Sequence, residues 1–285
     1  MSLRKHALIT GGSSGIGLAL AKKLVQAGYN VSLIARRKEV LQRAERELKP
    51  HFVAPDQQIY THSADVAERD QASAAADAAV EALGVPELVV TSAGIAVPGY
   101  FQETSSEVFE RSMAVNYFGT LYVIQAVLPA MRRQRRGRIV LISSGAALMG
   151  IFGYGSYGPS KFAVRGLAET LRAELTRDNV AVSVVYPPDT ETPMLEEENK
   201  TKPAETKLIT ALAKAWTADA VANCIMRGIQ RGRFAITPGS TVTLMHRWPG
   251  AVIPLLRWYC DRLVRSVRPE ATGRSIRLGE ASRPS

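Results

Sequence analysis

The sequence is poor in cysteine, with Cys224 and Cys260 as the two examples among 285 residues. Two cysteines cannot build a framework of disulfides, which excludes a small disulfide-stapled secreted scaffold. We interpret both as small hydrophobic residues in a reducing compartment. The four histidines are scattered and show no metal-ligand spacing, so we predict no metal site.

Long apolar segments are also lacking. A membrane-spanning helix needs about 18 uncharged apolar residues, and the nearest approach, 248–260, is interrupted by Pro249, Pro254 and Arg257. The apolar residues before the first glycines are too few for a secretion signal. We therefore predict a cytoplasmic protein that does not span a membrane.

The composition is that of a globular protein with a basic bias. Hydrophobic residues make up 46% and charged residues 22%, while 36 Lys and Arg against 26 Asp and Glu give a net charge of +10. Such a charge suits nucleic acid, an anionic membrane or a polyanionic cofactor. The basic run 132–138 lacks interleaved aromatic residues. We interpret it as a solvated helix end and predict no nucleic-acid partner.

Short apolar runs alternate with helical patterns up to about residue 186. The predicted strands are 7–9, 31–35, 58–62, 88–91, 139–142 and 180–186. The first predicted helix follows the glycines and ends at Gln26. The other predicted helices are 38–48, 67–83, 157–177, 200–216 and 218–230. Continuous apolar runs are typical of buried parallel strands. The alternation predicts an α/β fold, a doubly wound parallel sheet of the Rossmann type with helices on both faces.

A glycine-rich turn lies between the first predicted strand and the first helix. Gly11 would permit the tight turn, Gly15 would let the backbone approach a pyrophosphate, and Gly17 would let helix and strand pack closely. Backbone N–H groups and the helix dipole would hold the phosphates. The residues predicted to bind a dinucleotide here are Gly11, Ser13, Ser14, Gly15, Ile16 and Gly17.

The second predicted strand lacks the terminal carboxylate that an NAD site uses to bind the ribose 2′-hydroxyl. Cations follow it instead, at Arg36, Arg37 and Lys38. A bidentate contact from Arg36 with a 2′-phosphate, with added charge from its neighbours, predicts NADPH/NADP+ as cofactor. Ser13 could reach the same phosphate. The alternative is that these cations solvate the start of a helix.

Tyr157 and Lys161 are four residues apart at the start of a predicted helix, so they face the same cleft. A nearby ammonium stabilises phenolate and lowers the pKa of a tyrosine. Tyr157 could then donate a proton to the alkoxide formed in carbonyl reduction. Ser143 and Ser144 follow a predicted strand at the sheet edge where ligands bind, and a hydroxyl there would polarise a carbonyl.

These motifs, in this order, resemble the short-chain dehydrogenase/reductase family over about residues 7–194. The resemblance implies Ser144 as the catalytic serine, with Ser143 as the weaker alternative, and Asn116 as a water-linked relay to Lys161. It also implies cofactor contacts, in addition to Tyr157 and Lys161, from Asp65, Val66, Ala93, Gly94, Pro187, Thr190 and Thr192. Asp65 would contact the adenine and Thr192 the nicotinamide carboxamide. Family members generally pair through the helices of Asn116 and Tyr157, which implies a homodimer or homotetramer.

The segment 186–206 is similar to the 3-ketodihydrosphingosine reductases, with Pro187-Pro188 in place of the usual Pro-Gly. This similarity implies NADPH-dependent reduction of a long-chain 2-amino-3-ketone lipid. Two other functions stay open. One is a broad carbonyl, steroid or ketoacyl reductase of the same family, which the loop 188–207 would discriminate. The other is a dinucleotide-binding regulator without turnover, which the intact set of Ser144, Tyr157, Lys161 and Asn116 disfavours.

The last forty residues, 246–285, contain eight Arg and three acidic residues. We therefore divide the chain into a reductase domain, 1–245, and a basic, partly apolar and helical C-terminal extension, 246–285. Aromatic residues interleave with arginines in the extension, which suits peripheral contact with a membrane surface. The alternative is that its apolar residues cover the domain core or a subunit contact.

Overall fold

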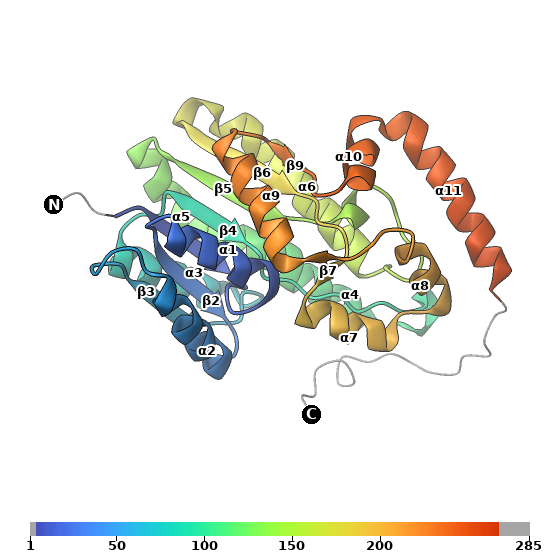
Figure 1. Cartoon of the computed structure of the whole chain (residues 1–285), viewed down its shortest axis with the longest axis horizontal. Coiled ribbons are helices and arrows are strands. Elements are labelled where there is room, and N and C mark those ends of the chain that lie inside the picture. The colour runs from blue at the N-terminus through green and yellow to red at the C-terminus, as the bar shows by residue number, and fades with distance from the viewer. Residues whose placement is uncertain (1–3, 268–285) are drawn as a thin grey trace.

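The computed structural model describes residues 4–267 and contains a parallel sheet between two layers of helices (Figure 1). The sheet has seven strands in the order β3-β2-β1-β4-β5-β6-β9, and every pairing is parallel. Its strands are β1 His6–Thr10, β2 Asn30–Ala35, β3 Ile59–Ser63, β4 Leu88–Thr91, β5 Gly137–Ile142, β6 Val180–Val185 and β9 Ala235–Ile236. A separate short pair consists of β7 Thr190–Glu191 and β8 Trp216–Thr217.

Helices cover both faces of the sheet, each over its own hydrophobic core. One face carries α1 Gly15–Gln26, α2 Lys38–Leu48 and α9 Ala218–Gln230. The other carries α3 Arg69–Leu83, α5 Gly119–Gln134 and α6 Tyr157–Glu174. Strands such as β1 and β4 are buried along their whole length, which explains their unbroken apolar sequences. The predicted doubly wound fold is confirmed.

The strand order reverses between β1 and β4, which are neighbours in the sheet although two other strands separate them in sequence. A parallel sheet opens a crevice at the carboxyl edge where its order reverses. The turn after β1, the segment after β4 and the serines after β5 therefore meet at one edge.

The prediction of one helix over 200–216 is wrong. The chain instead forms α7 Pro193–Thr201 and α8 Ala204–Thr210, and then enters β8. Lys202 has extended backbone angles, because the ring of Pro203 disfavours helical geometry in the residue before it. The seventh strand, β9, has two residues and no distinctive sequence pattern, and it was not predicted.

One continuous helical run within residues 4–267, from Ser106 to Gln134, is long and apolar enough to cross a bilayer by length and composition. It joins α4 Ser106–Met113, a π-helical turn Ala114–Phe118 and α5. In this structure, Val123, Val127 and other side chains of α5 are buried against the sheet. The length and hydropathy of the run Ser106–Gln134 are therefore those of a helix that packs in the core of the domain.

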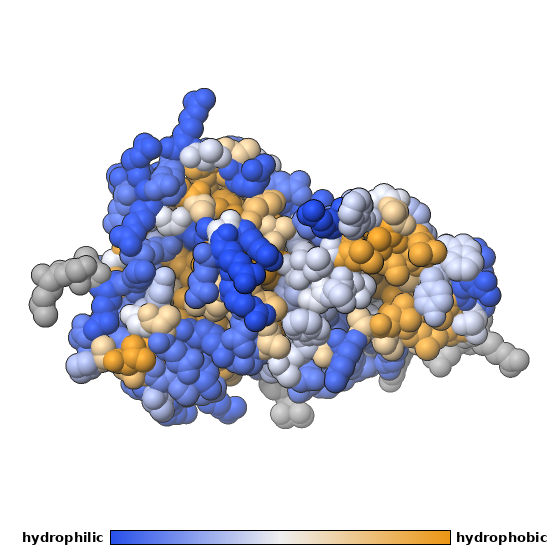
Figure 2. Space-filling model, turned by 45° about the horizontal axis from the view of Figure 1, so that its top comes forward, coloured by the Kyte–Doolittle hydropathy of each residue, from blue (hydrophilic) through white to orange (hydrophobic). Residues whose placement is uncertain are grey.

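Two C-terminal helices, α10 Ser240–Arg247 and α11 Pro249–Ser266, follow the last strand (Figure 1). One face of α11 packs against the domain through Leu256, Cys260 and neighbouring apolar residues. The opposite face leaves Leu255, Trp258 and Tyr259 exposed. Figure 2 shows hydrophobic side chains gathered over this end of the molecule. Residues 268–285 of the predicted extension lie outside the described residues.

Candidate active site

A cavity of about 530 Å³ lies at the carboxyl edge of the sheet, where the strand order reverses. It brings together most of the predicted site residues from five separate segments of the chain. Those lining it are Gly11, Ser14, Gly15, Ile16, Ala93, Gly94, Ser143, Ser144, Tyr157, Lys161, Pro187, Thr190 and Thr192. The predicted residues outside its lining are Ser13, Gly17, Arg36, Arg37, Lys38, Asp65, Val66 and Asn116.

The turn between β1 and α1 has the geometry that a phosphate cradle requires. Gly11 and Gly15 have φ angles of +66° and +54°, which disfavour residues with a Cβ. A Cβ on Gly11 would lie 2.7 Å from the Ala93 nitrogen. The side chain of Ser14, at the N-cap of α1, makes no capping hydrogen bond, so the N–H groups of the first turn face the cavity without that partner. The turn therefore fits the diphosphate of a dinucleotide.

The loop after β6 closes over this turn. A Cβ on Gly15 would come within 2.9 Å of Thr192 Cγ2. The hydroxyl of Thr192 accepts a hydrogen bond from Leu195 N–H at 3.3 Å and thereby caps α7. Thr190 is held in the loop by a 2.8 Å hydrogen bond to the Pro188 carbonyl. The predicted cofactor residues of this loop therefore lie opposite the glycine turn.

Three exposed cations follow β2: Arg36, then Arg37 at the N-cap of α2, and Lys38 as the first residue of that helix. The Arg36 carbonyl accepts a 2.8 Å hydrogen bond from Ser63 Oγ at the end of the adjacent strand β3. This contact fixes the backbone beside the Arg36 side chain, which is free to meet an anion from solvent. Exposure of three cations in place of a carboxylate fits a 2′-phosphate.

Asp65, just after β3, is engaged by protein groups. Its carboxylate forms an ion pair with Arg111 and accepts a 3.0 Å hydrogen bond from Ala67 N–H. Burial acts to raise the pKa of Asp65, but these hydrogen bonds and the charges of Arg111 and Arg36 outweigh it, so the pKa is lowered. Val66 is buried beneath it against Gly119.

The two serines after β5 have different surroundings. Ser143 is buried, and its hydroxyl donates a 2.8 Å hydrogen bond to the Lys161 carbonyl. Ser144 Oγ accepts a 3.1 Å hydrogen bond from Ala146 N–H and also hydrogen-bonds Tyr157. Ser143 thus fixes the start of α6, whereas Ser144 shares the cavity wall with the phenol.

The expectation that the neighbouring ammonium lowers the pKa of Tyr157 is wrong as a net effect. Burial raises the pKa of this phenol, the carboxylates of Glu198 and Asp189 add to the increase, and the hydrogen bond with Ser144 opposes it. Loss of water around the phenol is the largest of these causes, and it disfavours the charged phenolate. Tyr157 is therefore held as the neutral phenol, the form that donates a proton.

Lys161 lies beside the Tyr157 ring, and both Lys161 and Asn116 lie beside Gly94. Lys161 Nζ is 5.7 Å from the centroid of the Tyr157 ring and donates a 3.1 Å hydrogen bond to the Ile142 carbonyl. Burial lowers the pKa of Lys161 to about 8, although the charge of Glu198 raises it in part. A Cβ on Gly94 would lie 3.2 Å from Asn116 Oδ1 and 3.3 Å from Lys161 Nζ, so both side chains converge on Gly94.

Asn116 is fully buried in the π-helical turn. Its amide oxygen accepts from Ile95 N–H at 2.8 Å, and its amide nitrogen donates to the Ile95 carbonyl at 3.0 Å and to Ser160 Oγ at 2.8 Å. These bonds tie the segment after β4 to the first turn of α6. In this structure the side chain of Asn116 therefore positions the cavity wall.

The cavity also contains a carboxylate to which the sequence analysis gave no role. Glu198 lines it from α7, is 6% exposed, and accepts a 2.8 Å hydrogen bond from the Tyr154 hydroxyl. The rings of Tyr154 and Tyr157 lie 5.4 Å apart. A helical-period analysis of 193–201 could have placed Glu198 on the inner face of α7, but not beside Tyr154.

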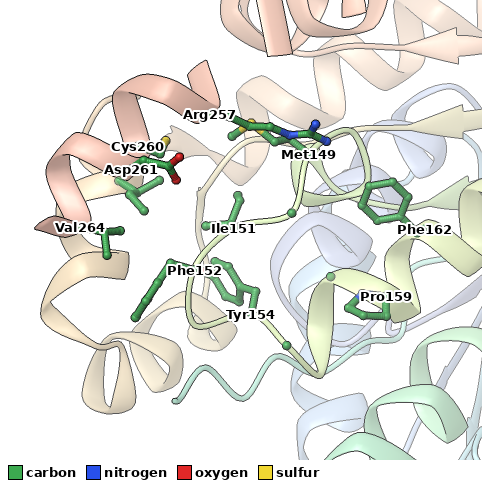
Figure 3. A pocket seen from close by; sticks show the side chains of 14 residues that line it. Met149, Ile151, Phe152, Tyr154, Pro159, Phe162, Arg257, Cys260, Asp261 and Val264 are labelled. Atoms are coloured by element: carbon green, nitrogen blue, oxygen red, sulfur yellow. The ribbon is translucent and has the colours of Figure 1, made fainter. Parts of the chain in front are cut away.

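A second cavity, of about 750 Å³, adjoins the first and is mostly apolar. Figure 3 shows it between α11, the loop 149–154 and the start of α6, with Phe152, Phe162 and Val264 around it. The two cavities share wall residues, namely Met149, Ile151, Tyr154, Ile209 and Cys260. An apolar space thus lies directly beside the polar site, on the side that faces α11.

Fold and site together define an oxidoreductase of the dinucleotide-binding α/β class. The model of the family described as short chain dehydrogenase matches residues 5–203, and the chain belongs to this family. The resemblance seen in the sequence is thereby confirmed.

Within the family, the chain is similar to proteins named 3-dehydrosphinganine reductase or 3-ketodihydrosphingosine reductase. It is 40% identical to the 3-dehydrosphinganine reductase of Danio rerio over 235 residues, which cover 82% of this chain and 71% of the relative. It is also 40% identical to the 3-ketodihydrosphingosine reductase of Mus musculus over 236 residues, again 82% of this chain and 71% of the relative.

Solved structures agree on the fold. Levodione reductase superimposes with a TM-score of 0.74 at 25% identity, covering 82% of this chain and 94% of that protein. A short-chain dehydrogenase/reductase from Burkholderia phymatum in complex with NAD gives a TM-score of 0.75 at 24% identity, covering 94% of this chain and 97% of that protein.

Proposed function

We propose that this protein reduces 3-ketodihydrosphingosine to dihydrosphingosine with NADPH. The observation that carries the proposal is the 40% identity with 3-dehydrosphinganine and 3-ketodihydrosphingosine reductases across 82% of the chain. The cavity supports it, because Ser144, Tyr157 and Lys161 meet there beside a glycine turn that fits a dinucleotide. A regulator without turnover would not need this set of groups in one cavity.

NADPH fits the residues on both sides of the cleft and, when bound, supplies the hydride. The turn from Gly11 to Gly17 would hold its diphosphate, and Arg36 with its neighbours would hold the 2′-phosphate. Ala93, Gly94 and the loop 187–192 would enclose the remainder of the cofactor. Asp65 and Val66 would border the adenine side from the end of β3.

Ser144 and Tyr157 act on the ketone oxygen in this mechanism. The Ser144 hydroxyl orients the carbonyl, and the Tyr157 phenol donates its proton to the oxygen as negative charge develops there. Lys161, as an ammonium, stabilises the phenolate that remains. Asn116 holds the segment after β4 and Ser160, the residue before Lys161, in place, while a relay through water would return a proton to the site.

The adjoining apolar cavity gives the substrate's alkyl chain a place. A long-chain ketone that reaches Tyr157 would extend past the shared wall of Met149, Ile151 and Ile209 toward α11. Burial of methylene groups is worth about 0.8 kcal/mol each, so this space would favour long chains over short ones. A general carbonyl reductase would have no use for that selectivity.

An NADPH-consumption assay tests the function. The substrate is 3-ketodihydrosphingosine, presented beside a steroid ketone, an acetoacetyl thioester and a small aromatic ketone. We expect the highest kcat/KM for 3-ketodihydrosphingosine. Equal or faster turnover of the unrelated ketones would favour the alternative of a broad-specificity reductase.

We further propose that the C-terminal extension, placed at 246–285, touches the membrane from which the lipid enters. The exposed Leu255, Trp258 and Tyr259 on α11 lie among arginines, and Arg262 stacks over the Trp258 ring at 5.2 Å. Such a mixture suits the headgroup region. In liposome flotation, the chain should bind anionic vesicles, and Trp258→Ala with Leu255→Ala should weaken that binding. Failure of the unaltered chain to float would reject the contact.

A homodimer or homotetramer paired through α5 and α6 completes the proposal. Phe118, at the end of the π-helical turn before α5, is 39% exposed, and Phe162, on α6, is 40% exposed. Exposed aromatic side chains of this kind favour subunit contact. Light scattering would give the oligomeric mass, and a monomer would contradict this pairing.

A further inference from the structure

Glu198 has an unusual place for a carboxylate. It lies on α7, where Glu196 and Glu197 are exposed, yet Glu198 is 6% exposed and lines the cavity that contains Ser144 and Tyr157. Burial raises the pKa of Glu198. Burying a carboxylate costs free energy unless a partner compensates the charge.

The partners of Glu198 within the described residues compensate that charge incompletely. Its Oε2 accepts a 2.8 Å hydrogen bond from the neutral Tyr154 hydroxyl and lies 3.6 Å from Lys202 Nζ. Lys202 is closer to Asp189, at 3.1 Å, so two carboxylates share this buried ammonium. When both carboxylates are ionised, Glu198, Asp189 and Lys202 together carry a net negative charge, and the two carboxylates line the cavity.

The position of this charge relative to the phenol matters. The carboxylate of Glu198 is near enough to raise the pKa of Tyr157, and Tyr154, its hydrogen-bond donor, packs 5.4 Å from the Tyr157 ring. A ketone whose oxygen accepts a proton from Tyr157 could therefore direct one of its two neighbouring carbon atoms toward Glu198 in the same cavity. A cationic group on that neighbouring carbon would complete the missing charge.

We propose that Glu198 binds the ammonium group of a 2-amino-3-ketone and so selects this substrate class. The inference rests on the proposed function, because it names the group on the substrate that the site recognises. The amino-bearing carbon is bonded directly to the carbonyl carbon, so one bound orientation satisfies both Tyr157 and Glu198. A ketone without the amine leaves a buried carboxylate incompletely paired, which is the strongest basis for rejecting an analogue.

The first arm of the test uses the unaltered protein and two ketones of equal chain length. One is 3-ketodihydrosphingosine, and the other has hydrogen in place of its 2-amino group. We expect kcat/KM to favour the amino ketone by about 10- to 100-fold, the range for a hydrogen bond between charged groups. Equal values for the two ketones would overturn the role of Glu198 while leaving the reductase function in place.

The second arm compares Glu198→Gln with Glu197→Gln. Glutamine keeps an oxygen that accepts from Tyr154, and Glu197 is an exposed residue of the same helix, paired with Lys200. Glu198→Gln should reduce kcat/KM at least tenfold more for the amino ketone than for the amine-free ketone, mainly through KM. Glu197→Gln should behave like the unaltered protein. An equal loss on both ketones would overturn amine recognition.

Calorimetric titration with octylamine supplies a readout apart from turnover. This probe has the amine and lacks the ketone. Its Kd should rise at least tenfold in Glu198→Gln and stay unchanged in Glu197→Gln, whereas equal affinity in all three proteins would overturn the proposal. If the unaltered protein reduces neither ketone but binds octylamine through Glu198, the proposed reductase function fails and the amine site stands.

Discussion

The two walls of the cleft are built in different ways. One wall, from β1 through β6, carries its functional groups at strand ends and in the first turns of helices, as with Gly11, Ser144 and Tyr157. The other wall, from Pro187 onward, holds Glu198 through a contact with the distant Tyr154, and together with the loop 149–154 and the start of α6 it encloses the apolar cavity. The comparison assigns the chemistry, common to a whole family, to the first wall and the choice of substrate to the second.

Among changes to the first wall, removal of the proton donor should have the largest effect on turnover. Tyr157→Phe should lower kcat by about 10²- to 10⁴-fold, the usual contribution of general acid catalysis. NADPH should still bind, because the glycine turn and Arg36 are untouched, and fluorescence titration of NADPH measures this. Tyr122→Phe, on α5 and outside the cavity, is the matched control. Normal turnover by Tyr157→Phe would refute its role.

Removal of one cation at the end of β2 should change the choice of cofactor. Arg36→Ala should raise KM for NADPH by about 10- to 100-fold, since a charged hydrogen bond to the 2′-phosphate is lost. KM for NADH should change far less. Arg43→Ala removes an exposed charge farther along α2 and serves as the control. A lower KM for NADH than for NADPH in the unaltered protein would contradict the NADP assignment.

The pH dependence of turnover tests the charge state of Lys161 in the first wall. Burial lowers the pKa of Lys161 to about 8, so its ammonium loses the proton as the pH rises through that value. The neutral amine no longer stabilises phenolate, and kcat/KM for ketone reduction should therefore fall on the alkaline side of about pH 8. Glu198 and Tyr157 line the same cavity as Lys161, so the pH profile also contains their titrations. A rate that stays constant to pH 10 would contradict this assignment.

Two neighbouring leucines on α11, in the second wall, allow a packed side chain to be compared with an exposed one. Leu256→Ala should lower the free energy of unfolding by about 1–3 kcal/mol, because Leu256 packs on the domain core. Leu255→Ala should change it by less than about 0.5 kcal/mol, because Leu255 is 64% exposed. Urea denaturation measures both. Equal losses would show that the exposed face of α11 is packed against other groups.

The sequence predicted the first wall well, for a physical reason. Strands such as β4 and β6 are buried on both faces and therefore read as unbroken apolar runs, and the groups that follow them must meet at one sheet edge. The Gly11–Gly17 turn adds a backbone requirement that few residues other than glycine meet.

The second wall has no such regularity. The break between α7 and α8 depends on Pro203, and a two-residue strand such as β9 has no period to detect. The buried carboxylate of Glu198 receives a hydrogen bond from Tyr154, which is 44 residues away in the sequence. The direction of the pKa shift of Tyr157 also depends on how much water the folded cavity excludes. The spacing of residues in the sequence gives no information on that.

Deuterium transfer tests the central claim most directly. The purified protein is incubated with 3-ketodihydrosphingosine and NADPH deuterated at the transferred position, and the sphingoid base is analysed by mass spectrometry and NMR. We predict dihydrosphingosine with deuterium at C3, formed by the unaltered protein and nearly absent with Tyr157→Phe. Unreduced ketone after incubation with the unaltered protein, or reduced product without deuterium at C3, would contradict the account.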